Sequence, residues 1–115
     1  MQKQILTLLV VFAGHALSGD LKKGDILNVN AGSLWFQTSG GLSVYQRFAT
    51  EISPEVLAKY REVVLQCREA WEFTAVQKVK VLFYNDPLDH QVWVEMLGPG
   101  SKKGTDWYID TKDIQ

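Results

Sequence analysis

The chain has 115 residues, of which 46% are hydrophobic and 22% charged, and these ordinary globular proportions exclude a disordered chain. Its 12 Lys and Arg residues against 13 Asp and Glu residues give a net charge of −1, so composition offers no basic excess for nucleic acid. The length predicts a single domain. Cys67 is the only cysteine, so no intrachain disulfide can form and the fold must depend on its apolar core.

The first 18 residues have the layout of a secretory signal peptide. A polar start contains Lys3, residues 5–13 are nearly all apolar, and the small residues Ala16 and Ser18 follow. Cleavage after Ser18 would leave residues 19–115 as one domain, and the apolar run is shorter than the roughly 20 residues of a membrane-spanning helix. We therefore predict an exported protein of the bacterial periplasm or cell envelope, with no stable membrane span after signal removal. The alternative is a buried first strand or helix of a cytosolic domain.

Two short strands are predicted between residues 26 and 38, within DILNVN and LWFQT, with the turn AGS between them. The glycines of SGG at 39–41 predict a flexible break. The stretch LSVYQRF at 42–48 fits either a strand or a loop.

Residues 53–71 carry the clearest pattern, that of an amphipathic helix. Ser53 suits the N-cap position and Pro54 the first helical position. Apolar residues recur at steps of three and four and form one stripe: Val56, Leu57, Tyr60, Val63, Val64, Cys67, Ala70 and Trp71. Because this helix is apolar on one side, we expect it to pack against another element.

After the helix the period changes to two, which predicts strands. QKVKVLFY at 77–84 and QVWVEML at 91–97 both alternate, and GPGSKKG at 98–104 leads to a last strand that contains Trp107, Tyr108 and Ile109. Because the three strands are consecutive and closely connected, they predict an antiparallel meander.

LNVNAGS at 27–33, KVKVL, VWVEML and GTDWYIDTKDI resemble the opening, central and closing strands of bacterial SH3-like domains, with Asn30 where an arginine is usual. The resemblance implies a mainly β fold, an SH3-like antiparallel barrel, here with an inserted amphipathic helix at about 53–71. The predicted barrel core is Val79, Val81, Phe83, Val92, Val94, Met96, Trp107 and Ile109. The helix residues expected to pack onto it are Leu57, Tyr60, Val64, Cys67 and Trp71.

The candidate reactive residues do not form a recognised catalytic or metal-binding pattern. Cys67 lies on the apolar stripe, so we predict a buried cysteine that acts as a small hydrophobe. Asp86, Asp89 and His90 fall in NDPLDH, which predicts a polar turn rather than a metal site. No nucleophile, base and oxyanion donor support one another, so the sequence predicts a protein that is not an enzyme and needs no cofactor or metal.

The aromatic residues suggest a binding surface. In a strand, residues two apart share a face, so Trp93 and Glu95 point away from the alternating Val92, Val94 and Met96. Tyr108 alternates in the same way with its neighbours, and Trp35 can lie near this face. We therefore predict Trp93, Tyr108, Glu95 and Trp35 as ligand-binding residues; the alternative is that these rings pack in the core or against the helix.

Two functions remain open at this point. The first is a non-catalytic binding module of the bacterial envelope that recognises a peptide, a protein or a cell-wall ligand. The second is a structural or interaction subunit whose helix docks into a larger assembly.

Overall fold

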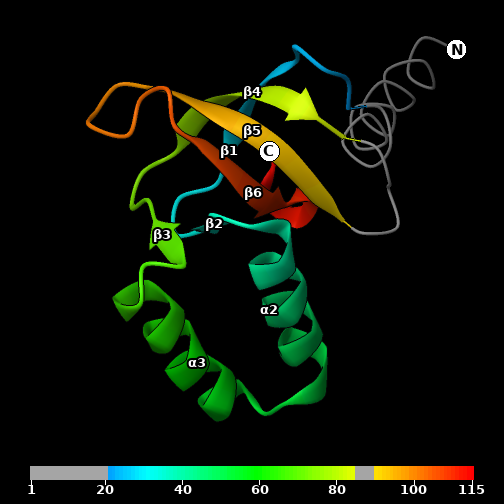
Figure 1. Cartoon of the computed structure of the whole chain (residues 1–115), viewed down its shortest axis with the longest axis vertical. Coiled ribbons are helices and arrows are strands. Elements are labelled where there is room, and N and C mark those ends of the chain that lie inside the picture. Colours follow the sequence, from blue (N-terminus) through cyan, green and yellow to red (C-terminus); the bar gives the residue numbers. More distant parts are fainter. Residues whose placement is uncertain (1–20, 85–89) are drawn as a thin grey trace, which may run out of the picture.

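The computed structural model describes residues 21–84 and 90–115 and shows a mainly β fold with two helices (Figure 1). The strands are β1 (Ile26–Val29), β2 (Leu34–Phe36), β3 (Ala70–Glu72), β4 (Gln77–Phe83), β5 (Gln91–Gly98) and β6 (Asp106–Asp110). The helices are α2 (Ser39–Glu51) and α3 (Pro54–Gln66), and a short 3-10 helix, η2 (Thr111–Asp113), follows β6. Within these described ranges, neither helix is long and apolar enough to cross a membrane.

All six strands belong to one antiparallel sheet in the order β1-β4-β5-β6-β2-β3. The consecutive strands β4, β5 and β6 are neighbours, which confirms the predicted meander. Beyond η2 the chain returns to β1, where Ile114 forms a bridge with Val29. The last residues therefore lie beside the first described strand.

The main core lies on one face of the sheet and follows the alternation of the strands. Seven of the eight predicted core residues are buried: Val79, Val81, Val92, Val94, Met96, Trp107 and Ile109. The eighth prediction is wrong, because Phe83 is 56% exposed. A register irregularity between Val81 and Phe83 interrupts the alternation and places Phe83 opposite the outward-facing Trp93.

The prediction of a single helix is also wrong, since the segment 39–51 forms α2. Thr38 caps this helix, and its hydroxyl oxygen accepts a hydrogen bond from the Gly41 amide at 3.0 Å. The two helices form a hairpin between β2 and β3 that extends from one end of the sheet (Figure 1). The glycines at 40 and 41 therefore lie in the first turn of a helix and do not mark a flexible break.

Helix α3 begins as predicted and ends earlier than predicted. The Ser53 hydroxyl accepts from the Val56 amide, and Pro54 occupies the first turn. The helix ends at Gln66, because Arg68 adopts a left-handed backbone with φ of 62° and turns the chain into β3. Cys67 is therefore exposed, and Trp71 lies on β3 with 38% of its surface exposed, so neither packs into the core as predicted.

At one end of the sheet, the helices cover the face opposite the main core. A second apolar cluster lies between the helices and this face. This cluster consists of Leu34, Phe36, Leu42, Val64 and Ala70, with Tyr45, Tyr60, Leu65 and Tyr108 packed against it. Strand β2 is buried on both faces, because Leu34 and Phe36 contribute to this cluster and Trp35 to the main core. Val64 and Tyr60 thus pack on the sheet as expected for the helix stripe, through the second cluster and not through the main core.

Candidate functional site

Two aromatic rings stack on the outer face of the sheet, opposite the main core. Trp93 of β5 and Tyr108 of β6 are direct cross-strand partners, and their ring centroids lie 5.9 Å apart with planes 11° from parallel. The Trp93 Nε1–H donates to the Asp106 carboxylate at 2.8 Å. Both residues are half-buried, and Tyr108 also packs against the second cluster, so the stack is held in place.

Phe83 and a row of charged residues surround this stack. Phe83 lies opposite Trp93 in the register, which extends the aromatic row across three strands. One step along the strands, Glu95 lies between Lys80 and Asp106, and its carboxylate is 3.8 Å from the Lys80 ammonium. The resulting surface is the outer aromatic face, defined here as Phe83, Trp93 and Tyr108 with Glu95 at its edge.

The structure brings together three of the four predicted binding residues and separates the fourth. Trp93, Tyr108 and Glu95 share the outer face, whereas Trp35 is completely buried in the main core. The ring centroids of Trp35 and Phe73 lie 4.4 Å apart, and the Trp35 Nε1–H donates to the Ser33 hydroxyl. Trp35 is therefore a core residue, because β2 is covered on both faces and its middle side chain points inward.

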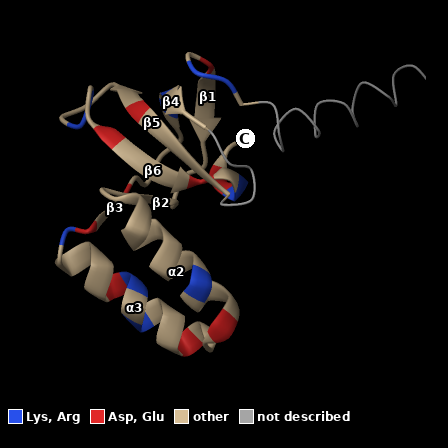
Figure 2. Ribbon diagram, turned by 45° about the vertical axis from the view of Figure 1, so that its right-hand side comes forward, with Lys and Arg blue, Asp and Glu red and all other residues tan. Residues whose placement is uncertain are grey.

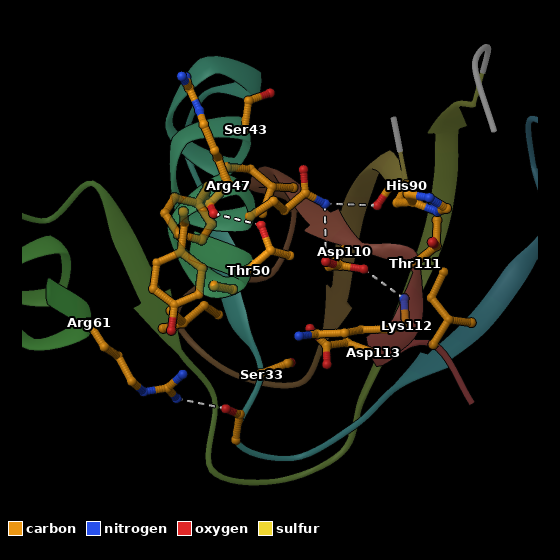
Figure 3. A pocket seen from close by; sticks show the side chains of 18 residues that line it. Ser33, Ser43, Arg47, Thr50, Arg61, His90, Asp110, Thr111, Lys112 and Asp113 are labelled. Carbon is orange, nitrogen blue, oxygen red and sulfur yellow. Dashed lines mark hydrogen bonds between the residues drawn. The ribbon is translucent and has the colours of Figure 1, made fainter. Parts of the chain in front are cut away.

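A second feature is a groove with a volume of about 970 Å³ between α2, the turn before β2, and η2 (Figure 3). Its apolar floor includes Phe36, Leu42 and Tyr45, which belong to the second cluster or pack against it. Strand β2 pairs with β6 only through Phe36 and Tyr108, and the groove lies beside that pair, with Phe36 in its lining.

Hydrogen bonds hold the upper wall of the groove. The Gln46 side-chain nitrogen donates to the Asp110 carboxylate at 3.0 Å and to the His90 carbonyl at 3.2 Å. The other oxygen of Asp110 accepts from the Lys112 amide at 2.9 Å, as Figure 3 shows. On the facing side, Arg61 donates to the Gly32 carbonyl at 2.8 Å and forms an ion pair with Glu72 at 3.1 Å.

Lys112 and Asp113 reach from η2 toward the space between Thr50 and Ser33 (Figure 3). Among the described residues, the side chains of Lys112 and Asp113 form no ion pair and no hydrogen bond. Burial raises the pKa of the Asp113 carboxyl, and the negative charge of Asp110 adds to this effect, while Lys112 and Arg61 oppose it.

The other candidate reactive residues lie apart on the chain. Asp86 and Asp89 lie outside the described residues, and His90 is exposed just before β5. Cys67 lies at the end of α3. Within the described ranges no three His, Cys, Asp or Glu side chains gather in a way that could hold a metal ion.

Sequence reasoning missed the groove because it missed α2. Leu42, Tyr45, Gln46 and Ala49 follow the i, i+3, i+4, i+7 spacing of one helix face, and all four line the groove. This spacing, with Thr38 as a capping residue, was the available signal.

Comparisons with known proteins give no match: no family model, no curated protein and no solved structure is significantly similar to the chain.

Proposed function

We propose that this chain is a non-catalytic binding module that recognises a peptide, a protein or a cell-wall ligand through the outer aromatic face. The observation that carries the proposal is the partly exposed stack of Trp93 and Tyr108, on the face opposite the main core. Rings that are already fixed lose little conformational freedom on binding, and they offer a large contact area. Glu95 at the edge supplies an acceptor for a cationic or hydrogen-bonding group of the ligand.

An SH3-like barrel is the proposed fold class for this module. The proposal is supported by the antiparallel meander, the 3-10 helix after β6 and the bridge from Ile114 back to Val29. The helical hairpin between β2 and β3 is then an insertion that covers one end of the sheet. The signal-like residues 1–18 lie outside the described residues and support export to the periplasm or cell envelope, and this part of the proposal is tested by the mature mass of the protein from its native host.

The test compares two tryptophans on neighbouring strands. Trp107→Ala removes a buried core ring and should lower the free energy of unfolding by about 3–5 kcal/mol. Trp93→Ala removes a partly exposed stacked ring and its hydrogen bond to Asp106, and it should cost less than Trp107→Ala, about 1–3 kcal/mol, so the variant should still fold. Stability is measured by urea denaturation, and binding by retention on immobilised peptidoglycan and on a random peptide library.

The proposal requires that folded Trp93→Ala loses the retention that the parent chain shows on one of these two probes. A matched control is Trp71→Ala, which removes an exposed tryptophan on β3 away from the outer aromatic face. If Trp93→Ala binds like the parent chain, or unfolds as readily as Trp107→Ala, the outer aromatic face is not the binding surface.

A second candidate function is that of a subunit that docks through α3. Val56 and Val63 lie seven residues apart on this helix, and each exposes about half of its surface, 52% and 49%. This reading requires association that increases with protein concentration and that Val63→Glu abolishes in sedimentation experiments. A monomer at all concentrations, without a partner retained through α3, favours the binding module.

A further inference from the structure

Among the residues that the structure describes, the groove between α2 and η2 carries two opposite charges, Lys112 and Asp113, that form no ion pair and lie beside an apolar floor. We propose that it binds a free α-amino acid with an apolar side chain, with the ammonium group on Asp113 and the carboxylate on Lys112. The lining shares no residue with the outer aromatic face, although Phe36 of the floor pairs with Tyr108, so the inference goes beyond the proposed function and does not depend on it.

The other charged residues of the groove are already engaged or point elsewhere. Asp110 accepts hydrogen bonds from the Gln46 side chain and the Lys112 amide, and Arg61 is bound to Glu72 and the Gly32 carbonyl. Arg47 extends along α2 away from Asp113 (Figure 3). Lys112 and Asp113 therefore remain as the adjacent charges that a ligand can pair.

The charge balance favours a ligand with both charges over a simple cation or anion. The three cationic side chains of the lining, Arg47, Arg61 and Lys112, are matched by Asp110, Asp113 and the Glu72 partner of Arg61. A cation that pairs with Asp113 would be repelled by the neighbouring Lys112, and an anion on Lys112 would be repelled by Asp113. A zwitterion satisfies both groups at once, because its opposite charges are only a few bonds apart.

The floor explains why the side chain of the ligand should be apolar. The half-buried Tyr45 and the exposed Ala49 supply apolar surface of the groove, above the buried side chains of Phe36 and Leu42. A volume of about 970 Å³ lies within the range of small-molecule sites, about 300–1,000 Å³, so the groove has room for one amino acid and bound water. Both helices also carry charges of both signs (Figure 2), so no single-sign field of the helices favours an anion or a cation instead.

The test uses three probes with the same side chain: leucine, N-acetylleucine and leucinamide. N-acetylleucine lacks the ammonium charge and leucinamide lacks the carboxylate. Each is titrated into the full chain, labelled with ¹⁵N, and amide shifts are followed by NMR. Leucine should shift amides of α2, the turn before β2 and η2, and each derivative should bind roughly tenfold or more weakly, because each loses one charged hydrogen bond.

Two variants connect the binding to the proposed residues. Asp113→Asn and Lys112→Gln should each weaken leucine binding by roughly tenfold or more, and Asp113→Asn should reduce the difference between leucine and N-acetylleucine. The matched controls are Glu62→Gln and Lys59→Gln on the exposed surface of α3, which should bind leucine like the parent chain. The spectra themselves report whether each variant is folded.

The proposal is overturned if leucine shifts no groove amides in the folded parent chain. It is also overturned if N-acetylleucine or leucinamide binds as well as leucine, since the groove would then recognise a single charge. The proposal is likewise overturned if the folded variants Asp113→Asn and Lys112→Gln bind leucine as tightly as the parent chain. None of these outcomes bears on the Trp93 experiment, so the two proposals can fail separately.

Discussion

Asp113 is a carboxyl group that the fold places in a half-buried position on the groove wall. Burial raises its pKa above the ordinary value of 3.8, and the carboxylate of Asp110 acts in the same direction. Lys112 and Arg61 stabilise the charged form and so limit the increase. Because the folded state holds the proton more tightly than the unfolded chain, the charged form of Asp113 opposes folding.

The raised pKa of Asp113 sets the direction in which the free energy of unfolding changes with pH. The unfavourable effect of Asp113 is absent below pH 3.8, develops as the pH rises through the raised pKa of the folded state, and is complete above it. Asp113→Asn cannot ionise, so it should be more stable than the parent chain at neutral pH, and this gain should vanish below pH 3.8. Urea denaturation of both chains at the two pH values measures it. A gain of equal size at both values, or a loss at neutral pH, contradicts the assignment.

At the scale of single residues, the alternation of apolar and polar residues predicted which strand residues are buried. This prediction was wrong where the backbone leaves the regular pattern. Val92, Val94 and Met96 are buried as predicted, because β5 is regular along this stretch. Phe83 follows a register irregularity, and Cys67 follows the end of a helix that Arg68 terminates with a left-handed backbone. These backbone changes depend on tertiary contacts and leave no periodic signal in the sequence.

At the scale of elements, the start of α3 and the central strands were predictable, whereas α2 was not. Ser53 and Pro54 form a strong start signal, and the strands from 77 to 110 alternate clearly. In α2, two glycines in the first turn have low helix propensity and suggested a break. Contacts with β2 and β6 offset this low propensity, so the helix depends on its packing against the sheet.

Gln91 is a polar anchor between the sheet and α2, in addition to the hydrogen bond of Gln46 to Asp110. Its side-chain oxygen accepts from the Ser39 hydroxyl at 2.6 Å, and its nitrogen lies 2.7 Å from the Ser43 hydroxyl and 3.2 Å from the Gln46 oxygen. These contacts join the start of β5 to the first two turns of α2. They explain why a helix with two glycines keeps a fixed position over the groove.

Gln91→Ala should therefore loosen α2 while the strands remain intact. Loss of these hydrogen bonds should lower the free energy of unfolding by about 1–2 kcal/mol. Amide hydrogen exchange should become faster in α2 and change little in the buried strands β4 and β5. The control is Gln66→Ala, at the exposed end of α3, which should stay within about 0.5 kcal/mol of the parent chain. Uniformly faster exchange in every element would contradict a local role for Gln91.

At the scale of the whole molecule, the sheet separates two apolar clusters, and each candidate site has a different origin. The outer aromatic face comes from alternation within β5 and β6, so Trp93, Glu95 and Tyr108 could be placed together from the sequence. The groove requires α2, η2 and the turn before β2 to come together. Such an arrangement of distant segments is set by the topology, which a local pattern does not report.

The return of the chain from η2 to β1 links the two ends of the described fold and should contribute strongly to stability. Ile114 is 5% exposed, packs in the main core and forms a bridge with Val29. The Asn30 amide donates to the Asp113 carbonyl at 2.8 Å, and the Gln115 amide donates to the Asn28 carbonyl at 2.9 Å. Strand β1 pairs with β4 along one edge, and these contacts cover its other edge.

Ile114→Ala tests whether this return holds the sheet together. The substitution leaves a cavity in the main core and should lower the free energy of unfolding by about 2–5 kcal/mol in urea denaturation. Ile26→Ala is the matched control: it makes the same change on β1 itself, where the side chain is 52% exposed, and should stay within about 0.5 kcal/mol of the parent chain. Amide exchange in β1 should increase more in Ile114→Ala than in Ile26→Ala, because only the first loses the contact that covers this strand. Equal stability of the two variants would mean that the end of the chain rests on β1 without fixing it, and the proposed barrel would lose its main support.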